Sequence, residues 1–481
     1  MSTTAFPTPE SATPAPGTPG ALTVGVVGLG YLGAVHAAGM AALGHRVVGY
    51  DVDPRKIDAL QQARAPFFEP GLEDLLASTQ GENLVFTHDV TDLKGADVVF
   101  VAVGTPQRKG ELAADTSYVT AAVESLSAIL PGPALIVGKS TVPVGTAAAL
   151  AERLAETAPE LEVAWNPEFL REGHAVDDTL HPDRLVFGVT SERAEALLRR
   201  VYARPIADDT PVVVTDLATA ELVKVAANSF LATKISFINA MAEVAEAAGA
   251  DVETLADAIG YDDRIGRKFL NAGLGFGGGC LPKDIRAFMA RAGELGADQA
   301  LTFLREVDSI NLRRRSKVVE LAREASGGSF VGRRIAVLGA AFKPHSDDIR
   351  DSPALNVAAQ ASLQGADVVV TDPAALDNAQ AHWPDLSYAA TAEEAITGAD
   401  VVVLATEWPE YLALDPKALA LIARGRTVID ARNALDPAAW QAAGWTYRGL
   451  GRRVADAGTM TAGTTPTRTT PTRTTSVRRA A

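Results

Sequence analysis

The chain holds one cysteine, and it stands in a glycine-rich stretch. Cys280 is the only cysteine in 481 residues and lies in GLGFGGGCLPKD, residues 273–284. A thiol becomes a usable nucleophile near neutral pH only when cationic neighbours favour the thiolate, and Lys283 is a candidate neighbour. The stretch therefore indicates a catalytic cysteine, against the more common case of a lone cysteine that packs as a small apolar residue. We expect the nearby glycines to admit a ligand close to the backbone rather than to serve packing, since they lack a Cβ; they are Gly275, Gly277, Gly278 and Gly279.

Two further pairs of polar residues stand four positions apart, and in a helix this spacing places both members of a pair on one face. Lys224 and Asn228 lie in a long, alanine-rich and mostly apolar stretch, where an unpaired ammonium would be costly to bury. They could donate hydrogen bonds to a developing oxyanion, or Lys224 could belong to a structural ion pair. Glu168 and Glu172 follow a predicted strand in WNPEFLREG, where Pro167 could begin a short helical turn. These two carboxylates are candidates for chemistry, or else form a solvated charge pair.

The N-terminal part of the chain predicts a dinucleotide site. A strand, a glycine turn, a helix and a second strand follow one another in TVGVVGLGYLGAVHAAGMAALGHRVVGYD. Gly28, Gly30 and Gly33 fit G-x-G-x-x-G, which needs a tight turn, close approach to a pyrophosphate and close packing of helix on strand. Asp51 ends the second strand, where a carboxylate would bind the ribose hydroxyls and disfavour the 2′-phosphate of NADP. The pattern favours NAD over NADP and over a non-binding turn; the cations that leave NADP open are Arg55 and Lys56.

Later strands should bring more polar residues to the same edge, because open α/β sheets bind ligands at the carboxyl ends of their strands. The stretches GADVVFVAVGTP and ALIVGKSTVPVGT each end in Gly, Thr and Pro. This expectation places Thr105 and the run of Lys139, Ser140 and Thr141 on the cofactor side.

The C-terminal part repeats the strand pattern without the complete glycine pattern. RRIAVLGAAFKP, GADVVVTDP and GADVVVLATEWPEY echo the first unit, but Ala341 and Pro344 replace the second and third glycines. We therefore expect this turn not to cradle a dinucleotide. Its strand ends offer a cationic rim suited to another phosphate ligand, or only scattered surface cations; these residues are Lys343, Arg350 and Arg432.

Length and composition limit the class of protein. A chain of 481 residues exceeds what one core usually serves. The net charge of −15 argues against nucleic acid as a partner, and no apolar run suits membrane insertion. One cysteine excludes an internal disulfide and a cysteine metal cluster, and with the missing signal peptide it favours the cytoplasm. Residues 1–20 and 453–481, rich in Pro and Thr, are expected to be disordered tails.

With these motifs the chain resembles the UDP-glucose/GDP-mannose dehydrogenase family from about Thr23 to Arg452. GLGYLG, KSTVPVGT, NPEFLREG, HPDR, ELVKVAANSFLA, FGGGCLPKD and AFKPHSDDIRDSP occur in the family's order. FGGGCLPKD looks most like the branch that oxidises UDP-glucose, because Gly279 stands where the UDP-N-acetylmannosamine branch usually has His. The GDP-mannose branch has a similar cysteine loop. The resemblance implies an α/β fold with two Rossmann-like, doubly wound domains, at 21–214 and 326–452, joined by a helical domain at 215–325 that usually forms a homodimer.

The resemblance also implies roles for matching positions and no metal. Cys280 is the implied nucleophile, Lys224 and Asn228 the oxyanion stabilisers, and Glu168, Thr141 and Asp284 the groups that handle protons and water. The implied NAD residues are Gly28, Gly30, Tyr31, Leu32, Gly33, Asp51, Lys56, Thr105, Thr141, Glu172, Cys280, Lys283 and Arg350. The implied residues for the UDP-sugar are Glu168, Phe169, Leu170, Lys224, Asn228, Arg264, Phe276, Gly277, Lys343 and Arg432, with Arg264 reaching a neighbouring subunit's site.

The expected reaction is a four-electron oxidation of UDP-glucose to UDP-glucuronate with two NAD, through a thiohemiacetal and a thioester on Cys280. A thiol explains how an aldehyde, a poor hydride donor, becomes a good one. GDP-mannose or another nucleotide sugar is the alternative substrate. Two other classes stay open: a two-electron hydroxyacid dehydrogenase of the 6-phosphogluconate type, and an NAD-sensing or scaffold protein. Neither of these needs Cys280.

Overall fold

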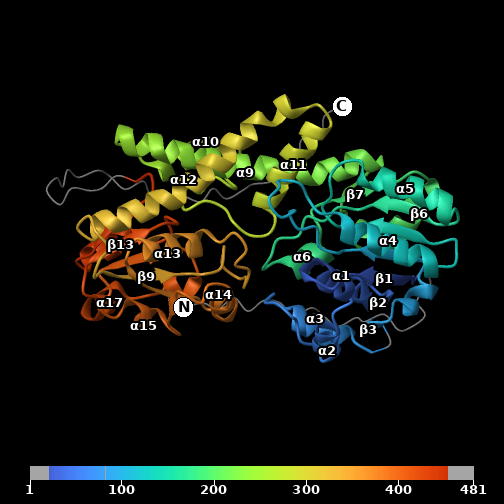
Figure 1. Cartoon of the computed structure of the whole chain (residues 1–481), viewed down its shortest axis with the longest axis horizontal. Helices are drawn as coiled ribbons and strands as arrows, with labels where there is room; N and C mark the ends of the chain where they lie inside the picture. Colours follow the sequence, from blue (N-terminus) through green and yellow to red (C-terminus); the bar gives the residue numbers. More distant parts are fainter. Residues whose placement is uncertain (1–20, 82, 453–481) are drawn as a thin grey trace, which may run out of the picture.

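The computed structural model describes residues 21–81 and 83–452 of the chain. The two expected tails, 1–20 and 453–481, lie outside the described residues. The described chain forms two α/β units at opposite ends, with long helices lying across both (Figure 1). This arrangement confirms the expected fold class.

The N-terminal unit is built on an eight-stranded sheet in the order β3-β2-β1-β4-β5-β6-β7-β8. All neighbours are parallel except β6 and β7, which meet antiparallel at Trp165 and Gly188. β4 and β5 are buried along their whole length, as expected for strands covered by helices on both faces. The strands are β1 Thr23–Val27, β2 Arg46–Tyr50, β3 Leu84–Thr87, β4 Val98–Val101, β5 Leu135–Gly138, β6 Glu162–Trp165, β7 Leu185–Gly188 and β8 Val212–Thr215.

Helices cover both faces of this sheet (Figure 1). The chain moves outward from β1 to β2 and β3, then returns to pair β4 with β1 on the other side. The reversal puts a crevice beside the carboxyl end of β1, where such sheets bind ligands. The helices are α1 Tyr31–Ala42, α2 Pro54–Gln61, α3 Leu72–Thr79, η1 Val90–Gly95, α4 Ser117–Ile129, α5 Thr146–Thr157, α6 Ala175–Leu180, α7 Glu192–Val201 and α8 Ala203–Ala207.

The central segment is helical and is dominated by α9, which runs for 32 residues. Asp216 caps its first turn through the Thr219 amide, and Gly249, with φ 69°, ends it in the left-handed conformation. α9 packs against α11 and α12, and in Figure 1 these helices lie above both α/β units. The helices are α9 Leu217–Ala248, α10 Val252–Gly260, α11 Leu281–Glu294, η2 Asp298–Leu301 and α12 Thr302–Ala325.

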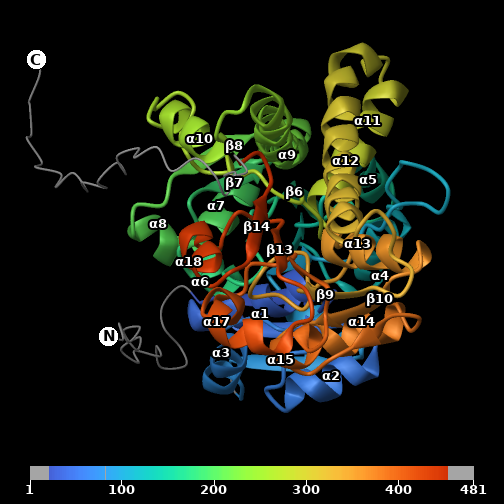
Figure 2. The same ribbon diagram turned by 90° about the vertical axis from the view of Figure 1, so that its left-hand side faces the viewer.

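The C-terminal unit has a six-stranded, fully parallel sheet in the order β11-β10-β9-β12-β13-β14. Figure 2 views this unit from its own end, with the N-terminal unit behind it. Its strands are β9 Arg334–Leu338, β10 Asp367–Thr371, β11 Ser387–Tyr388, β12 Val401–Leu404, β13 Thr427–Asp430 and β14 Thr446–Gly449. Its helices are α13 Pro353–Leu363, α14 Leu376–His382, α15 Ala392–Ile396, α16 Pro409–Leu412, α17 Pro416–Ile422 and α18 Pro437–Ala442.

The end of the C-terminal unit returns to the central helices. The Gly451 amide donates to Glu246 at 2.8 Å, and the Val252 amide donates to the Gly451 carbonyl at 3.0 Å. These bonds fix the six-stranded unit against α9 and α10. Among the described residues no helix combines the length and apolarity needed to cross a membrane.

Candidate active site

Cys280 occupies the position just before α11, so its side chain lies at the positive end of a helix. The residue is accessible to solvent, yet its thiol lies among protein groups. Desolvation raises the pKa of this thiol to about 12, the carboxylates of Glu168 and Asp284 add to the rise, and the Lys224 ammonium opposes it. The cation that favours the thiolate is therefore Lys224 from α9, while Lys283, the candidate from the sequence, pairs with Asp284.

Lys224 and Glu168 form a buried ion pair beside the cysteine. The Lys224 ammonium lies 2.8 Å from a Glu168 carboxylate oxygen, and the two side chains are 6% and 13% exposed. Burial alone would lower the pKa of Lys224, but the charges of Glu168, Cys280 and Asp284 raise it. Lys224 is therefore held as a cation next to the thiol. The sequence analysis allowed for an ion pair of Lys224, and the structure has this pair, with Glu168, within the candidate site.

Asn228, one helical turn along α9 from Lys224, contacts the other carboxylate. Its amide nitrogen donates to Asp284 at 2.6 Å, and the Lys283 ammonium donates to the second Asp284 oxygen at 2.7 Å. The Thr105 hydroxyl is 3.5 Å from Lys283 and donates to the Thr141 carbonyl at 2.8 Å. These bonds join α9, α11 and the ends of β4 and β5, which are far apart in the sequence.

The glycines before Cys280 are required by contacts with the protein itself. A Cβ on Gly278 would lie 2.8 Å from the Phe342 ring, and one on Gly279 would overlap the Arg350 guanidinium. A Cβ on Gly277 would overlap the Asp351 carbonyl oxygen, and a Cβ on Gly275 would overlap the Asn311 side chain. The expectation that these glycines do not serve packing is wrong: they let the cysteine loop pack tightly against α12 and the C-terminal unit.

The first glycine turn has the geometry that a pyrophosphate needs. Gly28 has φ 89°, a Cβ on Gly33 would overlap the Gly28 carbonyl, and a Cβ on Gly30 would meet nothing within 4 Å. No side chain caps the first amides of α1, and its first turn carries no acidic residue. The open space at Gly30 and the uncapped helix N-terminus therefore fit the phosphates of NAD.

Asp51 lies beside this turn with its carboxylate partly occupied. It accepts bonds from the Leu29 amide at 2.7 Å and the Lys56 ammonium at 3.0 Å. Arg55 is paired with Asp53 at 2.9 Å. Both cations near Asp51 are thus engaged with carboxylates, which weakens the case for a bound 2′-phosphate.

Glu69 is a site residue that the sequence analysis missed. It is 6% exposed, and its carboxylate accepts hydrogen bonds from the Tyr31 hydroxyl and from the Gly173 and Ala175 amides, the last two at 2.6 and 2.7 Å. Glu69 thereby fixes the loop after β6 against the start of α1. Only its neighbouring FFEP sequence sets it apart from other loop carboxylates, and no spacing rule would have found it.

Glu172 joins the two α/β units. Its carboxylate accepts a bond from Ser346 at 3.0 Å and lies 3.6 Å from Arg350, while its carbonyl accepts from Lys343 at 2.7 Å. Desolvation and the nearby Asp348 raise the pKa of Glu172 to about 7, against the opposing charges of Arg350 and Lys343. Lys343 and Arg350 therefore meet at a contact between the units.

A cavity of about 620 Å³ opens beside this contact. It is lined from the N-terminal unit by Tyr31, Phe67 and Glu172, and from the C-terminal unit by Arg350 and Trp383 among others. A pocket of this size fits a nucleotide-sized ligand.

Arg432 and Arg264 differ in placement. Arg432 is 12% exposed and donates to the carbonyls of Ala405, Gly275 and Phe342 at 2.7, 2.9 and 3.2 Å, so it links the cysteine loop to the C-terminal unit. Arg264 is 90% exposed, and its contacts within the described chain are with Asp262. The structure therefore does not bring Arg264 to the cysteine of its own chain.

The loop after β6 carries the other expected substrate residues. The Leu170 amide donates to Glu168 at 2.6 Å, and the Phe169 ring lies 5.7 Å from the Lys224 ammonium. Phe276 is buried in the cysteine loop, where its amide donates to Asn311 at 2.7 Å.

The sequence predicts Lys139 on the cofactor side of the sheet, and this prediction is wrong. Its ammonium is buried and bonds to Asn166 at 2.9 Å and Tyr202 at 3.2 Å. Burial lowers the pKa of Lys139 to about 8. Lys139 therefore points into the core, whereas Thr141 lines a narrow cavity together with Lys283 and Asp284.

The second α/β unit uses its strand-end carboxylate for structure. Asp372 is 2% exposed and accepts bonds from the Ala340 and Ala341 amides at 2.7 and 2.9 Å and from the Trp408 indole at 3.2 Å. A Cβ on Gly339 would overlap Thr406. The turn is thus filled by the protein, which supports the expectation that it does not cradle a dinucleotide.

Comparison with known proteins gives matches along most of the chain. The NAD binding, central and UDP binding domains of the UDP-glucose/GDP-mannose dehydrogenase family match residues 22–206, 218–313 and 336–437. The UDP-glucose 6-dehydrogenase of Rhizobium meliloti is 41% identical over 408 residues, which cover 84% of this chain and 93% of that protein. TuaD of Bacillus subtilis, also named a UDP-glucose 6-dehydrogenase, is 39% identical over 409 residues, 84% of this chain and 87% of that protein.

Solved structures of nucleotide-sugar dehydrogenases are also similar to this chain. A UDP-glucose dehydrogenase from Pyrobaculum islandicum is 39% identical with a TM-score of 0.82, covering 90% of this chain and 98% of that one. A UDP-D-ManNAc dehydrogenase from Pyrococcus horikoshii is 28% identical with a TM-score of 0.80, covering 90% of this chain and 100% of that one. The expected NAD cofactor is confirmed, because the glycine turn lies in a matched NAD binding domain. With three family domains matched in order and the cysteine loop within the second, the chain belongs to the UDP-glucose/GDP-mannose dehydrogenase family.

Proposed function

We propose that this chain is an NAD-dependent UDP-glucose 6-dehydrogenase that converts UDP-glucose to UDP-glucuronate. The observation that carries the proposal is Cys280 at the start of α11, beside the Lys224–Glu168 pair and the Asn228–Asp284 pair. A two-electron dehydrogenase has no use for this thiol. The names of the relatives support UDP-glucose as the sugar nucleotide.

The C6 alcohol would lose a proton and one hydride to give the aldehyde, and the cysteine adduct would lose the second hydride; each hydride requires its own NAD, so two NAD are used in turn. The Cys280 sulfur forms a bond to the aldehyde carbon, the thiol proton leaves, and the carbonyl oxygen takes a proton to give a thiohemiacetal. Loss of a hydride and a proton from this carbon and its oxygen gives a thioester. Water then adds to the thioester, releasing the carboxylate and returning the thiol.

The raised pKa of Cys280 makes the thiol the resting form, so its proton must be accepted as sulfur attacks. The Glu168 carboxylate is the proposed acceptor, because the loop after β6 holds it beside Lys224 and near the thiol.

Lys224 and Asn228 are the proposed stabilisers of the two oxyanions. Lys224 is held as a buried cation, and Asn228 presents amide hydrogens from the next turn of the same face. Donors fixed in a water-poor site need no reorganisation as charge develops. Asp284, bonded to both Asn228 and Lys283, is the proposed partner of the hydrolytic water together with Thr141.

The remaining roles follow the domain assignment. We place the NAD phosphates at Gly28, Gly30 and Gly33, and the adenosine ribose at Asp51. The sugar nucleotide lies between the cysteine loop and the C-terminal unit, near Lys343 and Arg432. The other assigned residues are Tyr31, Leu32, Lys56, Thr105, Glu172, Lys283 and Arg350 for NAD, and Phe169, Leu170, Phe276 and Gly277 for the sugar nucleotide.

We further propose a homodimer formed through α9, working in the cytoplasm. Phe230, Phe237 and Val244 lie seven residues apart, on one side of α9, and are 66%, 48% and 58% exposed. Burying such a stripe against a second copy removes apolar surface from water. Arg264 is exposed in the segment after α10, which leaves it free to reach a neighbouring subunit.

The test is an assay of the purified protein with NAD against UDP-glucose, GDP-mannose and UDP-N-acetylmannosamine, counting reduced cofactor per sugar. We expect two NADH per UDP-glucose and a carboxylate product. One NADH per sugar with an aldehyde product would contradict the mechanism, and preference for GDP-mannose would move the chain to another branch of the family.

A further inference from the structure

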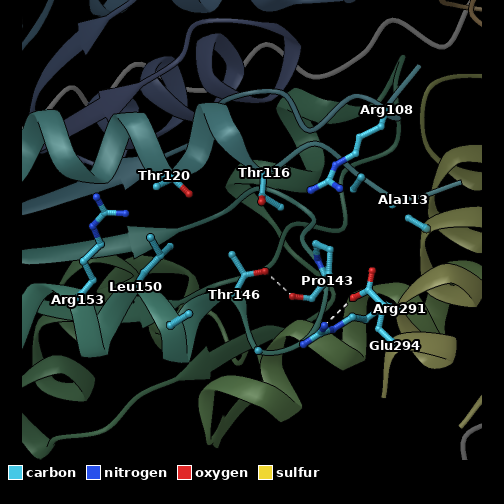
Figure 3. A pocket seen from close by; sticks show the side chains of 14 residues that line it. Arg108, Ala113, Thr116, Thr120, Pro143, Thr146, Leu150, Arg153, Arg291 and Glu294 are labelled. Atoms are coloured by element: carbon cyan, nitrogen blue, oxygen red, sulfur yellow. Dashed lines mark hydrogen bonds and ion pairs between the residues drawn. The ribbon is translucent and has the colours of Figure 1, made fainter. Parts of the chain in front are cut away.

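A second cavity, away from the glycine turn, lies between the N-terminal unit and α11. It has a volume of about 330 Å³, within the range of small-molecule sites. Its walls come from α4, the start of α5, the hairpin loop 107–114 and the last turns of α11. We call it the arginine pocket, because Arg108, Arg153 and Arg291 line it (Figure 3).

Arginine side chains line this pocket at both of its ends. Figure 3 shows Arg153 at one end, Arg108, Arg291 and the single acidic lining residue, Glu294, at the other, and the hydroxyls of Thr116 and Thr120 along the α4 side. None of the residues proposed for catalysis or cofactor binding lines the pocket.

The guanidiniums keep hydrogen-bonding capacity for a ligand. Arg108 is 3.7 Å from Glu111, beyond hydrogen-bond distance. Arg153 pairs with Glu124 through one terminal nitrogen. Arg291 uses two nitrogens, donating to the Val144 carbonyl at 2.8 Å and to Glu294 at 2.6 Å. Since each guanidinium has five N–H donors, several remain for an oxyanion.

The pocket also borders the catalytic residues. A third, narrow cavity adjoins the arginine pocket and shares Ala114, Pro143, Ala287 and Arg291 with it. This third cavity is also lined by Thr141, Lys283 and Asp284. Arg291 bonds to the loop that carries Thr141, and it lies on the same helix as Asp284. A ligand that holds Arg108 or Arg153 to Arg291 would therefore stiffen the contact between that loop and the helix that begins after Cys280.

We propose that the arginine pocket binds a small ligand bearing a phosphoryl group and that this ligand modulates turnover through α11. Planar guanidinium forks match the geometry of phosphate oxygens, and hydroxyls such as those of Thr116 and Thr120 supplement them. The binding part of this inference is independent of the proposed function. The effect on turnover, by contrast, rests on the proposed function.

The binding test uses inorganic pyrophosphate as the probe, with protein first saturated with NADH and UDP so that the proposed nucleotide sites are filled. Isothermal titration should show one saturable site. Replacing Arg108 and Arg153 together by Gln should weaken binding at least about tenfold, because charge-assisted hydrogen bonds are lost. Ala149→Phe, which changes no charge but fills the pocket from the exposed side of α5, should abolish binding.

The matched control is Arg199→Gln, which removes an exposed arginine paired with Glu195 on α7, outside the pocket. It should bind pyrophosphate as the unaltered protein does. No saturable binding, or the same loss in the control as in the pocket variants, would overturn the site and point to a general effect of charge.

The coupling test measures turnover with saturating NAD and UDP-glucose. Pyrophosphate should change kcat of the unaltered protein but leave kcat of the Arg108→Gln/Arg153→Gln protein within about twofold of its value without pyrophosphate. Equal responses of both proteins would overturn the coupling while leaving the binding result intact. Absence of any turnover on UDP-glucose would instead contradict the proposed function, so the two failures are distinguishable.

Discussion

At the scale of single residues, the site depends on charges that burial would otherwise remove. A cysteine thiol with a pKa of about 12, a lysine kept cationic by Glu168, and Asp284 held by Asn228 and Lys283 form one connected set. Each member alters the charge of its neighbours, so their effects will not be additive. Two substitutions separate chemistry from structure.

Cys280→Ser should retain binding of NAD and UDP-glucose but complete almost no oxidation to the acid. A serine hydroxyl keeps the size of the side chain and lacks the nucleophilicity of sulfur. Binding is measured by calorimetry and turnover by NADH formation. Two NADH per sugar at the unaltered rate would exclude the covalent mechanism.

Lys224→Met should lower kcat by roughly 10²–10³ with little effect on NAD affinity, because it removes a donor to the oxyanions. It also leaves Glu168 buried without its partner, which can destabilise a protein by about 3–5 kcal/mol. The double variant Glu168→Gln/Lys224→Met removes both charges and should recover thermal stability. If the Lys224→Met protein, assayed at a temperature where its melt shows it folded, turns over at the unaltered rate, Lys224 has a structural role only.

At the scale of elements, glycines decide how closely the helices and loops approach. Gly33 lets α1 pack on the Gly28 carbonyl, and Gly278 and Gly279 let the cysteine loop pack on Phe342 and Arg350. α9 carries Lys224 and Asn228 on its buried side and an apolar stripe on the other.

Gly30→Ala and Gly33→Ala form a matched pair. A Cβ on Gly30 meets open space, so Gly30→Ala should keep its melting temperature and lose NAD affinity. A Cβ on Gly33 overlaps the Gly28 carbonyl, so Gly33→Ala should lose affinity and about 1–3 kcal/mol of stability as well. Thermal melts and NAD titrations test this, and unchanged NAD affinity in Gly30→Ala would argue against phosphates at that turn.

The α9 stripe predicts the effect of charge on assembly. Phe230→Asp with Phe237→Asp should convert a dimer to monomers, because two buried carboxylates would face apolar surface. Light scattering after size exclusion measures the mass. The control is Leu363→Asp, an equally apolar position that is 88% exposed on α13. An unchanged mass for the α9 variant would place the interface elsewhere.

At the scale of the whole molecule, Glu172 links the two α/β units through Ser346, Lys343 and Arg350. These contacts border the cavity of about 620 Å³ between the units. Protonation of Glu172 therefore affects both the stability of the contact between the two units and the charge at the edge of the cavity.

The pKa of Glu172 is raised from 4.5 to about 7, so the folded protein holds a proton that the unfolded chain has released between these pH values. The free energy of unfolding should therefore fall as pH rises through this window, by on the order of 3 kcal/mol. Glu172→Gln cannot titrate and should show a flatter profile. Glu195→Gln, an ion-paired glutamate on α7, is the control. Identical profiles for Glu172→Gln and the unaltered protein would exclude this role.

The sequence by itself determined the elements and the residue types of the site. Alternating strand and helix patterns, G-x-G-x-x-G with Asp51, and one cysteine among glycines are local features, and local features can be read along a chain. The same reading also showed why the second glycine turn differs, since Ala341 and Pro344 stand where glycines would be needed.

Only the tertiary structure decided which partner each residue meets. Lys224 rather than Lys283 opposes the raised pKa of Cys280, Lys139 turns into the core, Glu69 fixes the loop after β6, and the cysteine-loop glycines serve contacts with distant segments. These outcomes depend on distances between residues far apart in the chain. Sequence spacing fixes which face of an element a residue occupies, but it does not fix what another element places opposite that face.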